Sequence, residues 1–330
     1  MSRQTKLVFF LVLSVVISWS IASGQTVKSV LVIVNKADSN LAIIDPNEMK
    51  VLGKVPVGDS PHEVVLSADG KTAYVSNYGA QTPGSSISVI DIASMKETRR
   101  VDVSPMLRPH GLWEMNGKLY FTSETNRLIA RYDPAANRID WIMGTGQNGS
   151  HMVVVSTDQK RFYTANIGSD SVTAFEFNNI PPAASKITHI PVGKQPEAIA
   201  ISPDAKEVWV GLNADLGIDV VDTATNKTVE RIKLGERPYR VVFAPDGKQV
   251  LATIPNTKEL VVIDVATRKE IKRMKLDSVP IGLTFTRNGR FAFVTTAQSN
   301  GVLKIDLEKL EVAGKVEPGN GPDGIAVAGI

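Results

Sequence analysis

Three of the four histidines recur at one position of a repeating pattern, and their spacing is the clearest sign of chemistry in the sequence. His62, His110 and His151 each stand at the start of a short apolar segment in successive repeats. Neutral imidazoles from neighbouring elements can bind a divalent transition metal, and Zn, Fe, Cu and Ni all accept such ligands. Glu197 has the same position one repeat later and would complete the metal site.

The position that carries these histidines occurs seven times along the chain. Its occupants are His62, His110, His151, Glu197, Tyr239, Ile281 and Asp323. Proline precedes it in six of the seven repeats, which fixes the backbone approach. Random placement of four histidines would put roughly 0.1 of them at such a position. The clustering therefore indicates a site, either for a metal or for a metal-free ligand, although hydrogen-bonding residues at a wet channel entrance are a third interpretation.

A second repeat position lies at the end of the following strand. It is expected to open at the same end of a central channel as the histidines, and we call this end the mouth. The occupants of this second position are Asn35, Asn77, Ser123, Asn166, Leu212, Ile254 and Thr296. The polar members accompany the histidines, whereas Leu212 and Ile254, with Ile281, form an apolar half. Such a split mouth favours a small amphipathic organic ligand. The ligand-binding residues expected besides the histidines are Asn77, Arg108, Asn166, Tyr239, Arg240 and Asp323.

Two function classes compete for this site, and a structural cell-surface domain with an inert channel is a third. The first is an exported binding protein that holds a small molecule or metal. The alternative is a metal-dependent lyase or lactone hydrolase, in which the metal polarises a carbonyl or activates water. Glu197 or Glu63 would then act as general base. His189, on a segment assigned to an outer strand, is expected to be structural.

The elements that position these residues are short strands in seven similar units. Six internal strands of successive repeats end in an acid. The acids are Asp91, Asp133, Glu176, Asp222, Asp264 and Asp306, at intervals of 42, 43, 46, 42 and 42 residues. Periods of about 40 to 45 residues with four strands each are typical of propeller blades. Asp-Gly turns, as at Asp69-Gly70, separate the first two strands of several units.

The two ends of the chain supply complementary parts of one unit. After Gly321–Gly324 only one strand remains, from Ile325 to Ala328, whereas Val30–Asn35 has no innermost strand before it. We therefore predict an all-β, seven-bladed propeller with four antiparallel strands per blade. Its ring is closed by a blade that the N- and C-terminal strands share, which removes free sheet edges.

These repeats resemble the YVTN family of seven-bladed β-propellers, whose units read S-P-D-G-K, Y-V-x-N and V-I-D. Tyr74–Asn77, Val89–Asp91 and Ser202–Asp204 match that pattern. The resemblance covers residues 27–330 and is weakest over Pro109–Arg131. It implies an exported binding or surface protein, similar to YncE-like propellers. Lactonases, a metal-dependent streptogramin lyase and the haem-d1 domain of nitrite reductases share the wider fold, so the resemblance leaves the function open.

Composition excludes several function classes. The formal net charge of +3 over 330 residues argues against a broad nucleic-acid-binding face. The chain has no cysteine, so disulfides, thiolate metal sites and thiol nucleophiles are excluded.

The N-terminus has the features of an export signal. Arg3 and Lys6 precede the apolar run Leu7–Ile17, and Ala22–Gly24 follows with small residues. We predict a signal peptide over residues 1–24, cleaved before Gln25, and one mature domain over 25–330. An uncleaved membrane anchor is the alternative. The mature protein is expected to be periplasmic or secreted, monomeric, without a transmembrane span, and accessible to an envelope protein partner.

Overall fold

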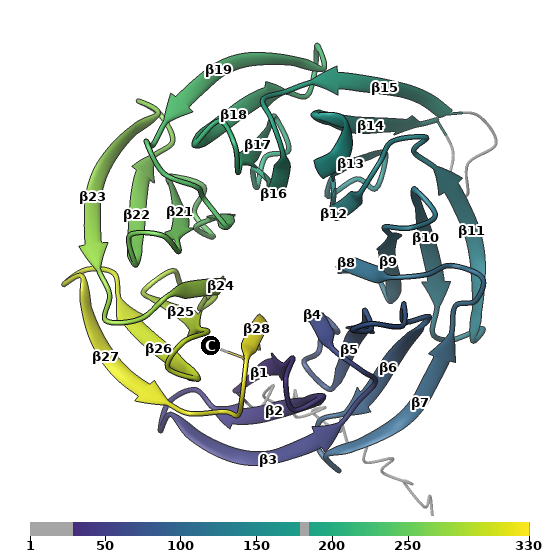
Figure 1. Cartoon of the computed structure of the whole chain (residues 1–330), viewed down its shortest axis with the longest axis vertical. Helices are drawn as coiled ribbons and strands as arrows, with labels where there is room; N and C mark the ends of the chain where they lie inside the picture. Colours follow the sequence, from purple (N-terminus) through teal and green to yellow (C-terminus); the bar gives the residue numbers. More distant parts are fainter. Residues whose placement is uncertain (1–28, 179–184, 330) are drawn as a thin grey trace, which may run out of the picture.

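Seven four-stranded antiparallel sheets form a closed ring around a central axis in the computed structural model (Figure 1). The structure describes residues 29–178 and 185–329, and the predicted signal peptide lies outside them. Among these residues the helical structure is limited to η1, a 3-10 turn at Ile167–Ser169. None of them forms a helix that is both long and apolar enough to cross a membrane. The predicted all-β, seven-bladed propeller is confirmed.

Each sheet runs from an innermost strand at the axis to an outermost strand at the perimeter. The innermost strands are β28 (Pro322–Ala328), β4 (Pro61–Leu66), β8 (Pro109–Met115), β12 (Ser150–Val155), β16 (Pro196–Ile201), β20 (Arg240–Phe243) and β24 (Pro280–Phe285). The second strands are β1 (Val30–Asn35), β5 (Thr72–Asn77), β9 (Lys118–Ser123), β13 (Arg161–Asn166), β17 (Glu207–Leu212), β21 (Gln249–Ile254) and β25 (Phe291–Thr296).

The third and outermost strands complete each sheet in chain order. The third strands are β2 (Asn40–Asp45), β6 (Ser86–Asp91), β10 (Leu128–Asp133), β14 (Ser171–Phe177), β18 (Gly217–Asp222), β22 (Glu259–Asp264) and β26 (Gly301–Asp306). The outermost strands are β3 (Lys50–Pro56), β7 (Lys96–Asp102), β11 (Arg138–Gly144), β15 (Ser185–Pro191), β19 (Lys227–Lys233), β23 (Lys269–Lys275) and β27 (Glu311–Val316).

The ring closes where the C-terminal strand joins the first N-terminal strand. The sheet order β28-β1-β2-β3 makes one blade from both ends of the chain. Antiparallel pairing sets Val30 opposite Ala328 and Ile33 opposite Ile325. This pairing completes the seventh four-stranded sheet, so the starts of all seven innermost strands surround one axis. The predicted shared blade is confirmed.

The repeated S-x-D-G-K turns have a direct physical basis. Asp69 accepts hydrogen bonds from the Ser67 hydroxyl at 2.7 Å and the Lys71 amide at 3.1 Å. Gly70 takes a φ of 67°, which glycine adopts without a Cβ clash. Ala205 replaces glycine in one repeat and still has a φ of 56°. The hydrogen bonds of the motif thus impose the turn even where the residue is not glycine.

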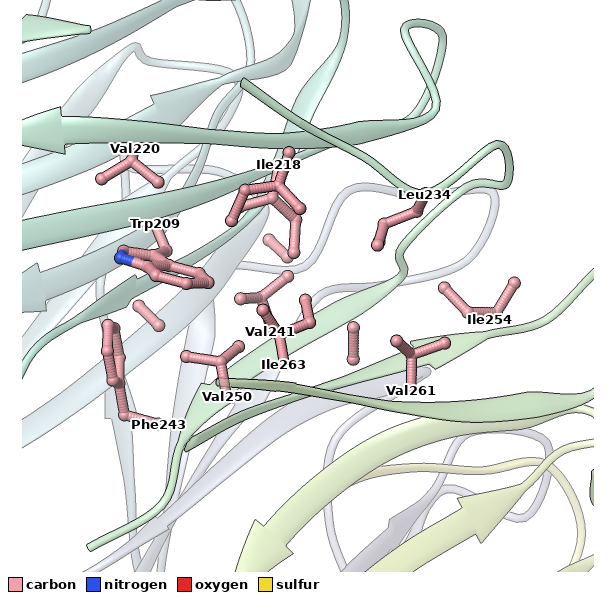
Figure 2. Close-up of a cluster of buried hydrophobic side chains, with 14 residues drawn as sticks. Trp209, Ile218, Val220, Leu234, Val241, Phe243, Val250, Ile254, Val261 and Ile263 are labelled. Carbon is pink, nitrogen blue, oxygen red and sulfur yellow. The ribbon is translucent and has the colours of Figure 1, made fainter. Parts of the chain in front are cut away.

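The apolar core lies between neighbouring blades. Figure 2 shows one cluster, in which Trp209 and Ile218 of one blade pack against Val250 and Ile263 of the next. These four side chains are fully buried, and the Trp209 and Phe243 rings lie 5.4 Å apart. Because close-packed apolar contacts tolerate little displacement, this packing holds the innermost strands, and therefore the residues at their ends, in fixed positions.

Candidate functional site

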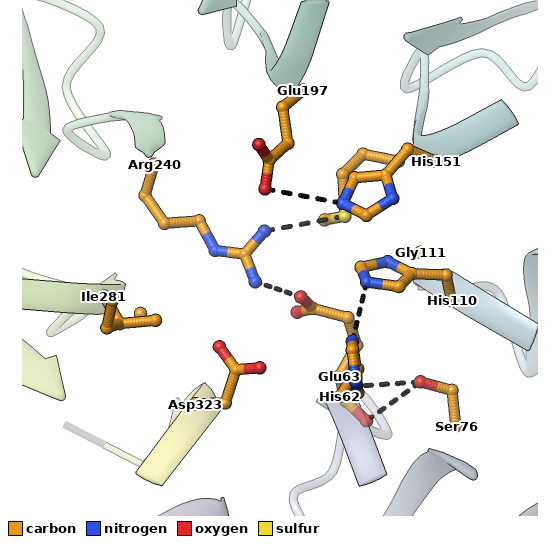
Figure 3. Close-up of polar contacts among 12 residues, drawn as sticks. His62, Glu63, Ser76, His110, Gly111, His151, Glu197, Arg240, Ile281 and Asp323 are labelled. Atoms are coloured by element: carbon orange, nitrogen blue, oxygen red, sulfur yellow. Dashed lines mark hydrogen bonds and ion pairs between the residues drawn. The ribbon is translucent and has the colours of Figure 1, made fainter. Parts of the chain in front are cut away.

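The three histidines of the repeat position meet at one end of the innermost strands, as Figure 3 shows. His62 Nδ1 lies 3.1 Å from His110 Nε2, so the two rings share one hydrogen bond. The His110 and His151 rings are tilted against each other with centroids 3.7 Å apart. Tyr78 stacks on His62 at 4.2 Å. Four aromatic rings from three blades therefore form one continuous cluster, which we call the histidine mouth.

A glycine lets two of these strands approach closely. A Cβ on Gly111 would lie 2.7 Å from the His151 carbonyl oxygen and 2.7 Å from the Met152 Cα. Any larger residue would push β8 away from β12. Gly111 therefore permits the contact between the His110 and His151 rings.

A carboxylate orients His151 in this cluster. Glu124, just after β9, accepts a hydrogen bond from His151 Nδ1 at 2.8 Å and another from the Tyr78 hydroxyl. Burial alone would raise the pKa of Glu124, but the bonds from His151 and Tyr78 outweigh it and lower that pKa. An ionised carboxylate fixes a proton on Nδ1 of the imidazole and so orients the ring.

Burial holds His62 and His110 neutral. Burial, reinforced by Lys36 and other nearby cationic groups, lowers the pKa of His62 to about 3. Burial also lowers the pKa of His110 well below its usual value. His110 Nδ1 is buried and has no hydrogen-bond partner among the described residues. Neutral imidazoles can accept hydrogen bonds or coordinate a metal at physiological pH.

Glu197 faces Nε2 of His151. Its Oε1 lies 3.7 Å from His151 Nε2, and its Oε2 accepts a hydrogen bond from Asn213. A separation of 3.7 Å is too long for a hydrogen bond between the two side chains. A carboxylate oxygen accepts hydrogen bonds, so this side of the mouth is complementary to a hydrogen-bond donor or a cation that approaches both atoms.

An ion pair spans the ring beside the mouth. Arg240 of β20 reaches across the axis to Glu63 of β4 (Figure 3), and each side chain is 11% exposed. Arg240 also contacts Met152 Sδ at 3.5 Å. Burial raises the pKa of Glu63, and Arg240 offsets part of that effect. Glu63, a predicted general base, is thus engaged with a cation.

The remaining predicted residues of this register also surround the axis. Asp323 is bound by Lys36 Nζ at 3.2 Å, while its Oδ1 is buried without a partner among the described residues. Ile281 lies beside it in Figure 3. Burial raises the pKa of Tyr239 far above its usual value. Arg108 donates to the Gly79 carbonyl at 3.2 Å and covers the Tyr78 ring at 4.6 Å.

The second repeat position does not line the mouth as the sequence suggested. Asn77 is buried within its blade, where its amide bonds Ser86, Ser88 and the Gly58 amide. Asn166 is fully buried and bonds Ser150 and Thr173. Leu212 and Ile254 are fully buried in the clusters between blades. These four residues stabilise the blades, and the expected apolar half of the mouth is reduced to Ile281.

The residues that face the mouth come one position later. They are Lys36, Tyr78, Glu124 and Asn213, each directly after the predicted position. Successive residues of a strand point to opposite sides. The side chain at the predicted position therefore lies inside the blade, and the side chain of the next residue faces the mouth. Polar or aromatic residues in four of seven repeats at that next position were the available signal. His189 lies on the outer strand β15 and approaches Thr173 at 3.2 Å.

The histidine cluster is not arranged around a metal position in this conformation. Among the residues that the structure describes, no group of three or more His, Asp or Glu side chains has the geometry to hold a metal ion. His62 and His110 point nitrogens at each other. The predicted metal site formed by His62, His110, His151 and Glu197 stays a prediction.

Comparison with protein families is decisive for the fold. The model of the YNCE-like beta-propeller family matches residues 115–289, more than half of the chain. The chain belongs to the YNCE-like β-propeller family. The resemblance inferred from the repeats is thereby confirmed. No curated protein matches the chain in sequence.

Solved structures share the architecture at low sequence identity. Hydrazine synthase of Kuenenia stuttgartiensis is 17% identical with a TM-score of 0.70, over 90% of this chain and 100% of that one. Dihydro-heme d1 dehydrogenase NirN in complex with DHE is 16% identical with a TM-score of 0.66, over 91% and 65%. A protein of Bacteroides uniformis provisionally described as a 6-phosphogluconolactonase is 11% identical with a TM-score of 0.77, over 91% and 100%. Such low identities establish the fold alone.

Proposed function

We propose that this protein is an exported binding propeller that holds a small amphipathic organic ligand at the histidine mouth. The observation that carries the proposal is the approach of His151 Nε2 and Glu197 Oε1, 3.7 Å apart in side chains that are 12% and 15% exposed. A polar group that loses water without gaining a partner costs free energy. A ligand amine has N–H donors for both atoms, whereas a hydroxyl can donate to one of them.

The surroundings of that pair favour an organic ligand with an apolar part. The aromatic cluster beside these two atoms contains Tyr78 stacked on His62, His62 edge-on to His110, and His110 tilted against His151. Ile281 and Tyr239 belong to the same ring of strand starts. The proposed ligand therefore places its donor at His151 and Glu197 and its apolar part along the rings. Export is part of the proposal and depends on the sequence of residues 1–24.

Binding can be tested with matched probes on the purified mature chain. Benzylamine and benzyl alcohol combine a ring with a donor, whereas benzaldehyde has the ring and only an acceptor. We expect the first two to raise the melting temperature in proportion to their occupancy, and benzaldehyde to have no effect. Equal stabilisation by all three would contradict the role of the acceptor pair.

Two carboxyl variants locate the binding. Glu197→Gln exchanges one acceptor for a donor and should weaken benzylamine binding about 10- to 100-fold, the loss expected for a charged hydrogen bond. Asp323→Asn is the matched control, because Asp323 is already paired with Lys36 at 3.2 Å. It should weaken binding less. Equal losses, or a larger loss from Asp323→Asn, would rule out this placement.

A second candidate function is a metal-dependent lyase or lactone hydrolase. Its support is that His62 and His110 are kept neutral by burial, and that His110 Nδ1 has no partner among the described residues. Structural neighbours include a protein provisionally described as a lactonase. In this mechanism the metal would activate water or polarise a carbonyl. Glu197 is the better general base, since Glu63 is bound by Arg240.

Elemental analysis separates the two candidates. Protein purified without a histidine tag should contain about one equivalent of a transition metal if the second is correct, and His110→Ala should abolish it. His189→Ala is the control, because His189 lies on an outer strand. Metal content that is equal in both variants would eliminate the histidine mouth as the metal site.

A further inference from the structure

Two cavities lie along the innermost strands beyond the Arg240–Glu63 pair. All seven innermost strands start at the histidine end, so residues later in each strand lie farther along the axis. The first cavity, about 190 Å³, borders Glu63 and Arg240 and continues along apolar residues such as Leu112 and Leu283. The second, about 600 Å³, reaches the ends of these strands. We call it the lower cavity.

The lower cavity has an apolar wall that is partly open to solvent. Val65, Leu66, Trp113 and Val327 line it and are all half-buried. Its size is within the roughly 300–1,000 Å³ that small-molecule sites occupy. Apolar surface left in contact with water is unfavourable, so a concave wall of this kind favours an apolar occupant.

Charged side chains stand at opposite ends of this cavity. Arg287, exposed just after β24, has no hydrogen-bond or ion-pair partner among the described residues. Its neighbour Arg290 pairs with Asp306 at 3.1 Å and Glu308 at 3.2 Å. Glu114, on β8 at the other end, accepts the Gly117 amide at 2.9 Å, and burial raises its pKa. Strands β28 and β4 separate the two charges.

We propose that the lower cavity is a second binding site, specific for a small apolar carboxylate. The carboxylate pairs with the guanidinium of Arg287, which is the cation at the rim. The hydrocarbon lies along Val327, Leu66 and Val65 toward Trp113. The Arg240–Glu63 pair separates this site from the histidine mouth, so the proposal does not depend on the function of that mouth.

Calorimetric titration of the mature chain with sodium octanoate tests the site. We expect octanoate to bind at least 10-fold more tightly than butyrate, because four additional methylene groups are buried at about 0.8 kcal/mol each before ordering costs. Octylamine, which has the same chain and the opposite charge, should bind more weakly than octanoate. Equal affinities for octanoate and butyrate, or for octanoate and octylamine, would overturn the proposal.

Two arginine variants test which side chain pairs with the carboxylate of the ligand. Arg287→Gln should weaken octanoate binding about 3- to 10-fold, as expected for one partly exposed ion pair. Arg290→Gln is the control on the same turn and should leave the affinity unchanged. Equal effects of the two variants would show that Arg287 does not bind the carboxylate.

A second pair of variants tests the wall. Leu66→Asp and Leu66→Asn have nearly the same shape and differ in charge, so a difference in octanoate affinity reports the approach of the anion. Asp should weaken binding at least 10-fold relative to Asn, with both melting temperatures measured to confirm folding. Saturating benzylamine should not displace octanoate. Displacement would show that both ligands share one site and would overturn the proposal of a second site. A failure of benzylamine alone to bind would refute only the proposed function of the histidine mouth.

Discussion

The buried pair of Arg240 and Glu63 gives the sharpest prediction of the structure. Each side chain is only 11% exposed, and the two come from opposite sides of the ring. Arg240→Met keeps the apolar stem but leaves the carboxylate unpaired. Removal of one partner of a buried ion pair costs about 3–5 kcal/mol. At roughly 2 °C per kcal/mol for a protein of this size, the melting temperature should fall by about 6–10 °C at pH 7.

The two single variants should differ in their dependence on pH. Burial raises the pKa of Glu63 above the ordinary value of 4.5. In Arg240→Met the penalty belongs to the ionised carboxyl, so it is complete above the folded-state pKa and disappears as pH falls toward 4.5. In Glu63→Gln the unpaired group is an arginine, which stays protonated throughout. Its deficit relative to the unmodified chain should therefore not shrink as the pH falls.

Urea unfolding at pH 5, 6, 7 and 8 measures both effects against the unmodified chain. The deficit of Arg240→Met should shrink at pH 5, and that of Glu63→Gln should not. The double variant Arg240→Met, Glu63→Met should recover most of the stability, because an apolar pair of similar volume is often neutral. A pH-independent deficit in Arg240→Met, or additive losses in the double variant, would refute the ion pair.

Three further predictions concern the ring and the mouth. Deletion of residues 321–330 removes β28 and its pairs with β1, so cooperative unfolding should be lost in thermal denaturation; an unchanged melting curve would contradict ring closure. Gly111→Ala should lower the free energy of unfolding in urea by about 1–3 kcal/mol, because the new Cβ overpacks against β12. Gly144→Ala, with no atom within 4 Å of the new Cβ, should change it little, and equal losses in the two variants would exclude the close approach. The pKa of His62 falls from 6.5 to about 3 on folding, so its contribution is complete above pH 6.5 and declines at up to about 1.4 kcal/mol per pH unit as pH falls toward 3; His62→Asn should flatten this decline, and an equally steep decline would exclude His62 as its source.

The fold was predictable because repetition substitutes for structural information. A period near 42 residues with Asp-Gly turns specifies the blade, and the incomplete units at the two ends specify the closure. The same repetition placed His62, His110 and His151 at equivalent strand starts. Equivalent positions on neighbouring blades must be close in a ring, so the cluster of three rings followed from the alignment of repeats.

The partners of those histidines were less accessible from the sequence. Glu124 and Tyr78 stand one residue after the position that repeat alignment selected. A polar residue at the end of a strand can either form its hydrogen bonds within the blade or face the mouth. Asn77 does the first, because its side-chain amide donates to Ser86 and Ser88. Composition alone does not distinguish these outcomes, because both keep the polar group hydrogen-bonded.

The Arg240–Glu63 ion pair could have been predicted from the alignment of the repeats. The two residues are 177 positions apart, yet both directly follow the histidine position and therefore have the same height along the axis. The other occupants of that register are Gly111, Met152, Ala198, Gly282 and Gly324. The register thus contains one acid and one base among uncharged residues. Because a buried charge requires a partner, and the register offers a single partner of opposite sign, the pairing across the ring follows from position and charge balance.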